Sequence, residues 1–130
     1  FGSKLPFLMK EKKEIFLTTD IINSPTYASD LTDCIKKLIE KQIYGIINVC
    51  NKGWCSWFDF GTKMKEFLKS EAKIKEIKFD EFSKIFDIPA KRPVFSPLSL
   101  NLLESMGIKM RPWEESIKSF IEEIFQKENP

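Results

Sequence analysis

The chain has 130 residues, of which 42% are hydrophobic and 31% charged, and 21 basic residues nearly balance 19 acidic ones to give a net charge of +2. This length and composition indicate one globular unit rather than a disordered or fibrous chain. The balanced charge argues against nucleic acid as a partner, because a nucleic-acid-binding domain carries clustered Lys and Arg. No apolar run approaches the length needed to span a membrane, which is about 18 residues.

The N-terminal half of the chain predicts two helices and two strands. Residues 3–13 can form a short helix, and Glu14 to Thr18 is a run of β-forming residues. A polar corner, Ser24 to Thr26, then leads into a pattern over residues 28–39 in which apolar residues recur on one helix face. Tyr44 to Cys50 is apolar and rich in β-branched residues, which predicts a buried strand.

The C-terminal half opens with a helix whose start is well signalled. Ser56 is a natural N-cap residue and Asp59 follows at the third helical position, so we expect a capping box. The apolar stripe of this helix, expected to be core, consists of Trp57, Phe60, Met64, Phe67 and Leu68. Lys73 to Phe79 alternates polar and apolar residues, as in a strand with one solvent-exposed face, and residues 80–86 can form one or two helical turns.

The remaining segments predict an extended stretch and two helices. Residues 88–99 contain three prolines and should be extended and ordered by packing. Leu100 to Met106 predicts a short helix that Gly107 closes, and a last amphipathic helix follows Pro112. The sequence thus predicts a single α/β unit, residues 1–130, with about five helices and three short strands, each strand separated from the next by a helix. A sheet of three short strands is small for an independent domain, so we expect this unit to be one lobe of a larger protein.

Several kinds of reactive site are excluded by residues that the chain lacks. Without histidine it can form neither a Ser-His-Asp nor a Cys-His nucleophilic site. The cysteines, Cys34, Cys50 and Cys55, are odd in number and lack paired spacing, so we expect free thiols in a reducing cytoplasm and no metal site. The five glycines are isolated, which leaves no Gly-rich phosphate loop, and no Tyr-x-x-x-Lys pair occurs.

Four stretches, taken together, resemble a known family. They are NSPTYASDL (23–31), GIINVCNKGWCSWFDF (45–60), PAKRPVFSPLSLNLLESMGI (89–108) and RPWEESI (111–117). Their order and spacing are similar to the C-terminal part of the dTDP-4-dehydrorhamnose reductases, which belong to the extended short-chain dehydrogenase/reductase superfamily. The resemblance covers nearly the whole chain.

This resemblance implies that the chain is the substrate-binding lobe of a Rossmann-type nucleotide-sugar reductase and is inactive alone. The missing N-terminal Rossmann part, expected before Phe1, would carry the Gly-rich turn for NADPH (or NADH) and the catalytic Tyr-x-x-x-Lys pair, and this lobe would bind no cofactor by itself. The intact enzyme would reduce the C4 keto group of dTDP-4-dehydro-L-rhamnose to give dTDP-L-rhamnose. The alternative is a non-catalytic binding or regulatory module that retains the same lobe.

Ser24, Pro25, Thr26 and Arg92 are the candidate substrate-binding residues. From the residues alone, the corner is either a simple connection or a loop held rigid against a ligand. The resemblance favours a loop that borders a sugar-nucleotide cleft, where proline fixes the backbone and hydroxyl or N–H groups face a polar ligand. Arg92 lies among prolines, and its planar guanidinium matches a pyrophosphate; the other interpretation is structural pairing with a carboxylate.

Overall fold

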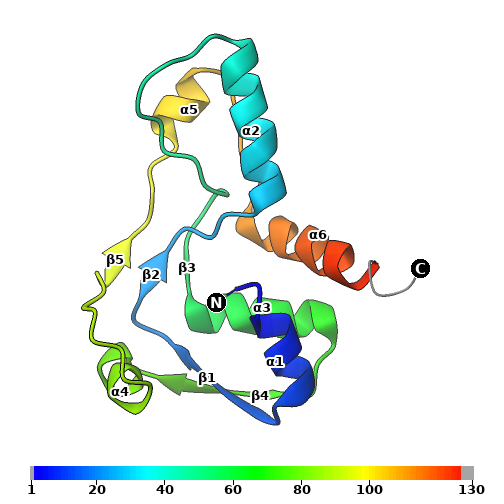
Figure 1. The fold of residues 1–130 in the computed structure, drawn as a ribbon, viewed down its shortest axis with the longest axis vertical. Coiled ribbons are helices and arrows are strands. Elements are labelled where there is room, and N and C mark those ends of the chain that lie inside the picture. The colour runs from blue at the N-terminus through cyan, green and yellow to red at the C-terminus, as the bar shows by residue number, and fades with distance from the viewer. Residues whose placement is uncertain (1, 127–130) are drawn as a thin grey trace.

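The structure, a computed structural model, describes residues 2–126, which form a base and an upper part (Figure 1). The base consists of α1 (Leu5–Glu11), β1 (Glu14–Thr18), α3 (Trp57–Leu68), β4 (Lys73–Ile77) and α4 (Phe79–Ile85). The upper part consists of α2 (Ala28–Glu40), the segment 41–50 and α5 (Asn101–Ser105). Between them lie α6 (Trp113–Gln126) and the short strands β2 (Ile22–Asn23), β3 (Cys55–Ser56) and β5 (Phe95–Ser96). The predicted α/β class is confirmed.

Two small sheets join segments that are far apart in sequence. β1 pairs in parallel with β4, from Glu14 opposite Lys73 to Thr18 opposite Ile77. In the second sheet, β2 lies between β3, to which it is antiparallel, and β5, to which it is parallel. The second sheet therefore brings the corner after β2, the start of α3 and the proline-rich segment next to one another.

Two clusters of buried side chains hold the molecule together. The main cluster lies in the base and against α6, and its fully buried members are Leu5, Met9, Ile15, Leu17, Cys55, Met64, Ala72, Trp113, Ile117 and Ile121. The second cluster lies in the upper part, and its members are Cys34, Cys50, Leu100, Leu103, Ile108 and Met110.

No helix within residues 2–126 is long and apolar enough to cross a membrane.

The helix α3 begins and packs as its sequence predicts. The Asp59 N–H donates to Ser56 Oγ and the Ser56 N–H donates to the Asp59 carboxylate, both at 3.0 Å, so the capping box is confirmed. Gly61 faces the main cluster, where an added Cβ would stand only 2.1 Å from Leu17 Cδ1. A residue without a side chain is therefore needed for α3 to lie this close to β1.

The predicted strand over Tyr44 to Cys50 is wrong. Gly45 bends the backbone here with a φ of +119°, and no strand pairs with these residues among residues 2–126. Ile47 and Val49 pack against the second cluster, whereas Tyr44 is 87% and Ile46 96% exposed. The apolar pattern was real, but a strand also needs a neighbouring strand to pair its backbone groups.

Three further expectations need correction. β1 and β2 follow one another without a helix between them, because only residues 19–21 separate them. Of the predicted stripe of α3 only Met64 is fully buried. Phe60, Phe67 and Leu68 are half-buried against the main cluster, and Trp57 is half-buried outside it. Trp57 is less buried than predicted because it forms part of the walls of two cavities.

Candidate functional site

The polar corner after β2 is held rigid by one buried side chain. Asn51, which is 0% exposed, accepts a hydrogen bond from the Tyr27 N–H at its Oδ1 (2.7 Å). Its own N–H donates to the Pro25 carbonyl (3.1 Å), and the Leu98 N–H donates to Ser24 Oγ (3.1 Å). The corner is thus fixed from two sides, by the segment before β3 and by the segment after β5.

An ion pair ties the start of α2 to the start of α6. Arg111 contacts the Asp30 carboxylate through Nη2 (2.8 Å to Oδ1) and Nε (2.8 Å to Oδ2), and its Nη1 donates to Ser119 Oγ (2.8 Å). Asn51 Nδ2 donates to the same carboxylate (2.6 Å). These contacts raise the pKa of Arg111, chiefly through the hydrogen bond to Asp30. Asp30, Asn51 and Arg111 therefore form one network directly beneath the corner.

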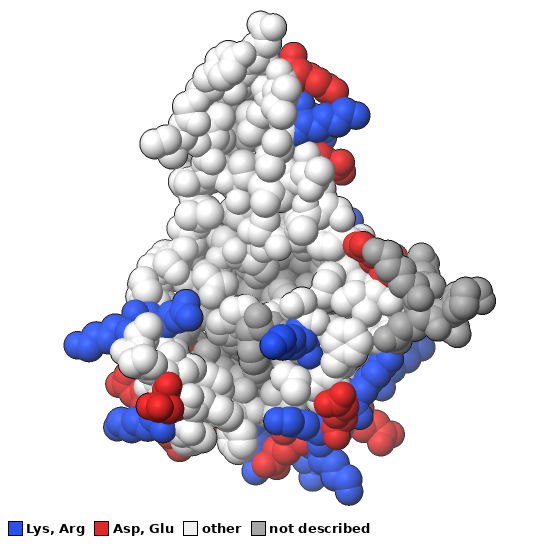
Figure 2. All heavy atoms as spheres, viewed as in Figure 1, with Lys and Arg blue, Asp and Glu red and all other residues white. Residues whose placement is uncertain are grey.

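A first cavity of about 520 Å³ opens beside the corner. Figure 2 shows the surface hollowed where the upper part meets the base. Its walls contain both hydroxyls and aromatic rings, from Thr26, Tyr27, Ser29, Ser56, Trp57, Phe60, Ser116 and Phe120. This mixture suits a ligand with both hydroxyl groups and apolar faces.

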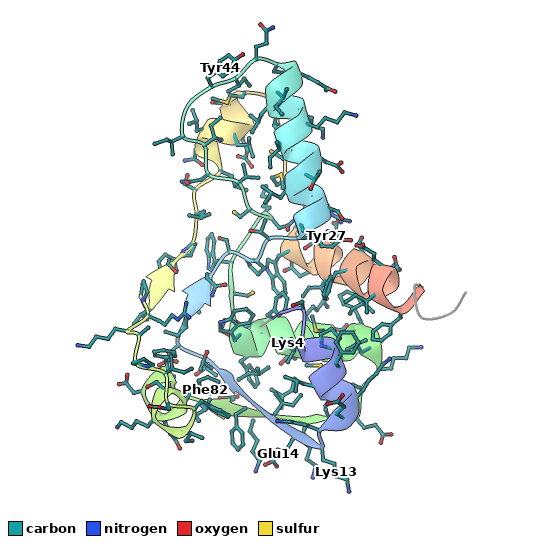
Figure 3. All side chains as sticks on the ribbon, in the orientation of Figure 1. Lys4, Lys13, Glu14, Tyr27, Tyr44 and Phe82 are labelled. Carbon is teal, nitrogen blue, oxygen red and sulfur yellow. The ribbon has the colours of Figure 1, made fainter. Side chains whose placement is uncertain are left out.

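Tyr27 lies where α2 begins, beside α6 (Figure 3). Its hydroxyl donates to the Glu123 carboxylate, and its ring lies edge-on to Phe120 with centroids 6.1 Å apart. Burial raises the pKa of Tyr27, and the hydrogen bond to Glu123 raises it further. The phenol therefore stays protonated at neutral pH and closes one side of the first cavity.

A second cavity of about 360 Å³ lies between β1, α4 and the proline-rich segment. Three phenylalanines, Phe16, Phe79 and Phe82, line it, and Arg92 stands in its wall; Figure 3 labels Phe82 on α4. Thr18 also lines it and is 4% exposed, and its hydroxyl has no hydrogen-bond partner within the described part of the chain. The second cavity thus combines flat apolar walls with an unpaired hydroxyl and a cation.

The two cavities adjoin, because Asn23 and Trp57 line both. Of the predicted site residues, Pro25 and Thr26 line the first cavity and Arg92 the second. Ser24 is not among the residues that line either cavity, and its hydroxyl accepts a hydrogen bond from the Leu98 N–H. Arg92 is exposed and forms no ion pair with any residue of the range 2–126.

Several important residues were not predicted from the sequence. Asn51 was not singled out, yet its side chain and backbone hold the corner. Tyr27 and Glu123 are 96 positions apart, and no local pattern marks them as partners. Phe16, Phe79 and Phe82 looked like ordinary strand and helix residues; only the fold gathers them.

Within residues 2–126, no cluster of three Cys, Asp or Glu side chains could hold a metal ion.

The family model of the RmlD substrate binding domain matches residues 1–126. The chain belongs to this family. The resemblance based on the four sequence stretches is thereby confirmed.

Relatives of this RmlD-type domain are longer proteins. This chain is 34% identical over 116 residues to the spore coat polysaccharide biosynthesis protein SpsK of Bacillus subtilis. The match covers 89% of this chain and 39% of SpsK. The structure of the dTDP-4-dehydrorhamnose reductase of Bacillus anthracis in complex with NADP is also similar, with 35% sequence identity and a TM-score of 0.86. The match covers 95% of this chain and 43% of the reductase. A reductase ortholog from Clostridium acetobutylicum is 30% identical with a TM-score of 0.87 and the same coverage. The chain therefore spans about two fifths of the length of its relatives.

Proposed function

We propose that this RmlD-type domain is the substrate-binding part of a nucleotide-sugar reductase. The intact enzyme would reduce dTDP-4-dehydro-L-rhamnose to dTDP-L-rhamnose with NADPH or NADH in the cytoplasm, where three buried free thiols persist. The isolated domain would bind the nucleotide-sugar without turning it over. The observation that carries the proposal is the pair of adjoining cavities. Arg92, which forms no ion pair within residues 2–126, stands in the wall of the second.

The shapes and charges of the two cavities suggest how a dTDP-sugar lies. The flat, mostly apolar pyrimidine fits the second cavity between Phe16, Phe79 and Phe82. The pyrophosphate then lies near the guanidinium of Arg92, which offers a charge-assisted, bidentate contact. The sugar extends past Trp57 into the first cavity, where Thr26 and the other hydroxyls of the walls can meet its oxygens.

A dinucleotide cofactor does not fit the residues of this chain. Its glycines at 2, 45, 53, 61 and 107 are isolated, so no Gly-rich turn is available to receive a pyrophosphate at a helix start. The chain also lacks the Tyr-x-x-x-Lys pair. We therefore assign the cofactor and the catalytic tyrosine to the remaining part of the intact polypeptide.

Binding of thymidine diphosphate to the 130-residue chain tests the proposal by calorimetry. Arg92→Ala should weaken binding at least about tenfold, because a charge-assisted hydrogen bond is worth about 1.5–3 kcal/mol. Lys91→Ala, which removes an equally exposed neighbouring cation, is the matched control and should bind as the unchanged chain does. Equal affinities for the unchanged chain and the Arg92→Ala variant would show that the pyrophosphate lies elsewhere.

Activity measurements separate the enzyme from the regulatory module. The isolated chain should not oxidise NADPH in the presence of a dTDP-4-keto sugar, and measurable turnover would refute the assignment of the catalytic groups. In the intact polypeptide, Arg92→Ala should raise KM for the nucleotide-sugar about tenfold and leave KM for NADPH unchanged. An intact polypeptide that binds thymidine diphosphate but lacks reductase activity would favour the non-catalytic module.

A further inference from the structure

One polar side chain stands at the junction of the two cavities. Asn23 lines both of them, whereas Thr26 lines only the first cavity and Arg92 only the second. Trp57 also lines both, and its indole lies edge-on to Phe60 with centroids 5.6 Å apart. A ligand that extends through both cavities therefore passes the Asn23 amide and the Trp57 ring.

The backbone of Asn23 is held in place by the second sheet. Asn23 belongs to β2, the middle strand, where it lies opposite Cys55 of β3 and Ser96 of β5 (Figure 1). Next to it, the Ile22 N–H donates to the Val94 carbonyl (2.8 Å). The fold therefore fixes the point from which the Asn23 side chain extends.

The side-chain amide of Asn23 is left without a hydrogen-bond partner within residues 2–126. Asn51, by contrast, uses its amide for the fold, because its Oδ1 accepts from the Tyr27 N–H (2.7 Å) and its Nδ2 donates to Asp30 (2.6 Å). Asparagine is also depleted in strands, where it packs poorly. The Asn23 amide thus adds nothing visible to the stability of the chain and is available to a ligand.

Two hydroxyls of the first cavity are already engaged. Ser56 Oγ donates to the Asp59 carboxylate (2.6 Å), and Ser116 Oγ donates to the Trp113 carbonyl (2.7 Å). Both serve the first turn of a helix, α3 and α6 respectively. The Asn23 amide differs from them, because it offers an unused donor and an unused acceptor to the space that it lines.

We propose that the Asn23 amide binds the hydroxyl group on the hexose carbon next to the anomeric carbon, an assignment that rests on the proposed function. With the diphosphate near Arg92 and the hexose in the first cavity, the first atoms of the hexose lie at the junction that Asn23 lines. A hydroxyl group donates and accepts, so it can use Oδ1 and Nδ2 together, whereas a phosphate oxygen only accepts. Asn23 thereby selects a hexose that carries this hydroxyl over one that lacks it.

Calorimetry with three ligands tests this role of Asn23. They are thymidine diphosphate, dTDP-L-rhamnose and dTDP-2-deoxy-L-rhamnose, which lacks the hydroxyl. The unchanged chain should bind dTDP-L-rhamnose about three- to tenfold more tightly than the 2-deoxy ligand, the range expected for one hydrogen bond. Asn23→Ala should bind these two ligands equally and should bind thymidine diphosphate as the unchanged chain does. Changing the side chain and the hydroxyl together isolates the contact between them.

Asn101→Ala is the matched control, because Asn101 is exposed on α5 and lines neither cavity. It should discriminate between the two sugar nucleotides as the unchanged chain does. Both variants should keep the urea midpoint of the unchanged chain, since neither amide forms a hydrogen bond within the described residues.

Three results would overturn the assignment. The first is equal binding of both sugar nucleotides by the unchanged chain, and the second is discrimination that persists in Asn23→Ala. The third is an equal loss of affinity for thymidine diphosphate and dTDP-L-rhamnose in Asn23→Ala, which would place the amide at the diphosphate. An unchanged chain that does not bind thymidine diphosphate at all would refute the proposed function itself, and the role of Asn23 with it.

Discussion

Replacing Asn51 with alanine should be among the most damaging single changes in this chain. The substitution removes the acceptor of the Tyr27 N–H (2.7 Å) and a donor to the Asp30 carboxylate (2.6 Å). Asn51 is completely buried, so water reaches the vacated site poorly. An unsatisfied buried donor costs about 1–3 kcal/mol and a lost charge-assisted bond about 1.5–3 kcal/mol, so we expect a loss of about 3–5 kcal/mol in the free energy of unfolding.

Urea unfolding followed by tryptophan fluorescence measures this loss. Ser116→Ala is the matched control, because Ser116 is also buried but its hydroxyl donates, among the described residues, only to the nearby Trp113 carbonyl (2.7 Å). The control should lose about 1 kcal/mol or less. If Asn51→Ala cost no more than the control, the corner would not depend on Asn51, and the network with Asp30 would contribute little.

Three further predictions concern the main cluster and the residues packed against it. Gly61→Ala should lower the free energy of unfolding in urea by about 1–3 kcal/mol, because the new methyl group collides with buried Leu17. Helix propensity alone would predict a gain, since alanine favours helices more than glycine does. A gain in stability would refute this packing. Phe67→Ala should cost about 2–3 kcal/mol, less than a fully buried phenylalanine, with Thr62→Ala on the exposed face of α3 as the neutral control. Burial raises the pKa of Cys55 from 9.0 to about 12. Between these pH values the folded chain keeps a thiol proton that the unfolded chain loses. The free energy of unfolding should therefore fall as the pH rises, by at most about 1.4 kcal/mol per pH unit. Cys55→Ala should abolish that part of the pH dependence, and an identical pH profile in the variant would contradict it.

Local signals in the sequence predicted the regular elements well. The strand Glu14–Thr18 has the predicted bounds, and the capping box of α3 forms as expected. Gly107, expected to close a short helix, has a φ of +77°. Each of these features depends on residues a few positions apart, which a single sequence displays directly.

Features that depend on distant residues could not be predicted. The strands β2, β3 and β5 have two residues each, too few for an alternating pattern. Asn51 finds its partners 21 and 24 positions away in the chain. The segment 44–50 shows the opposite failure, since its apolar pattern was recognised but no strand within residues 2–126 pairs with it.

The two buried clusters share the chain in an interleaved order. The polypeptide supplies the main cluster with residues 5–17, crosses to the second cluster at 34–50, returns at 55–72, crosses again at 100–110 and ends in the main cluster at 113–121. No contiguous piece therefore contains one cluster alone, although the base and the upper part look separate in Figure 1. The parallel pair of β1 and β4 cannot close before residues 73–77 exist, and α6 must arrive before the main cluster is complete. Folding consequently depends on contacts of long sequence separation, which slows it. A nascent chain therefore cannot complete the main cluster until α6 has been synthesised.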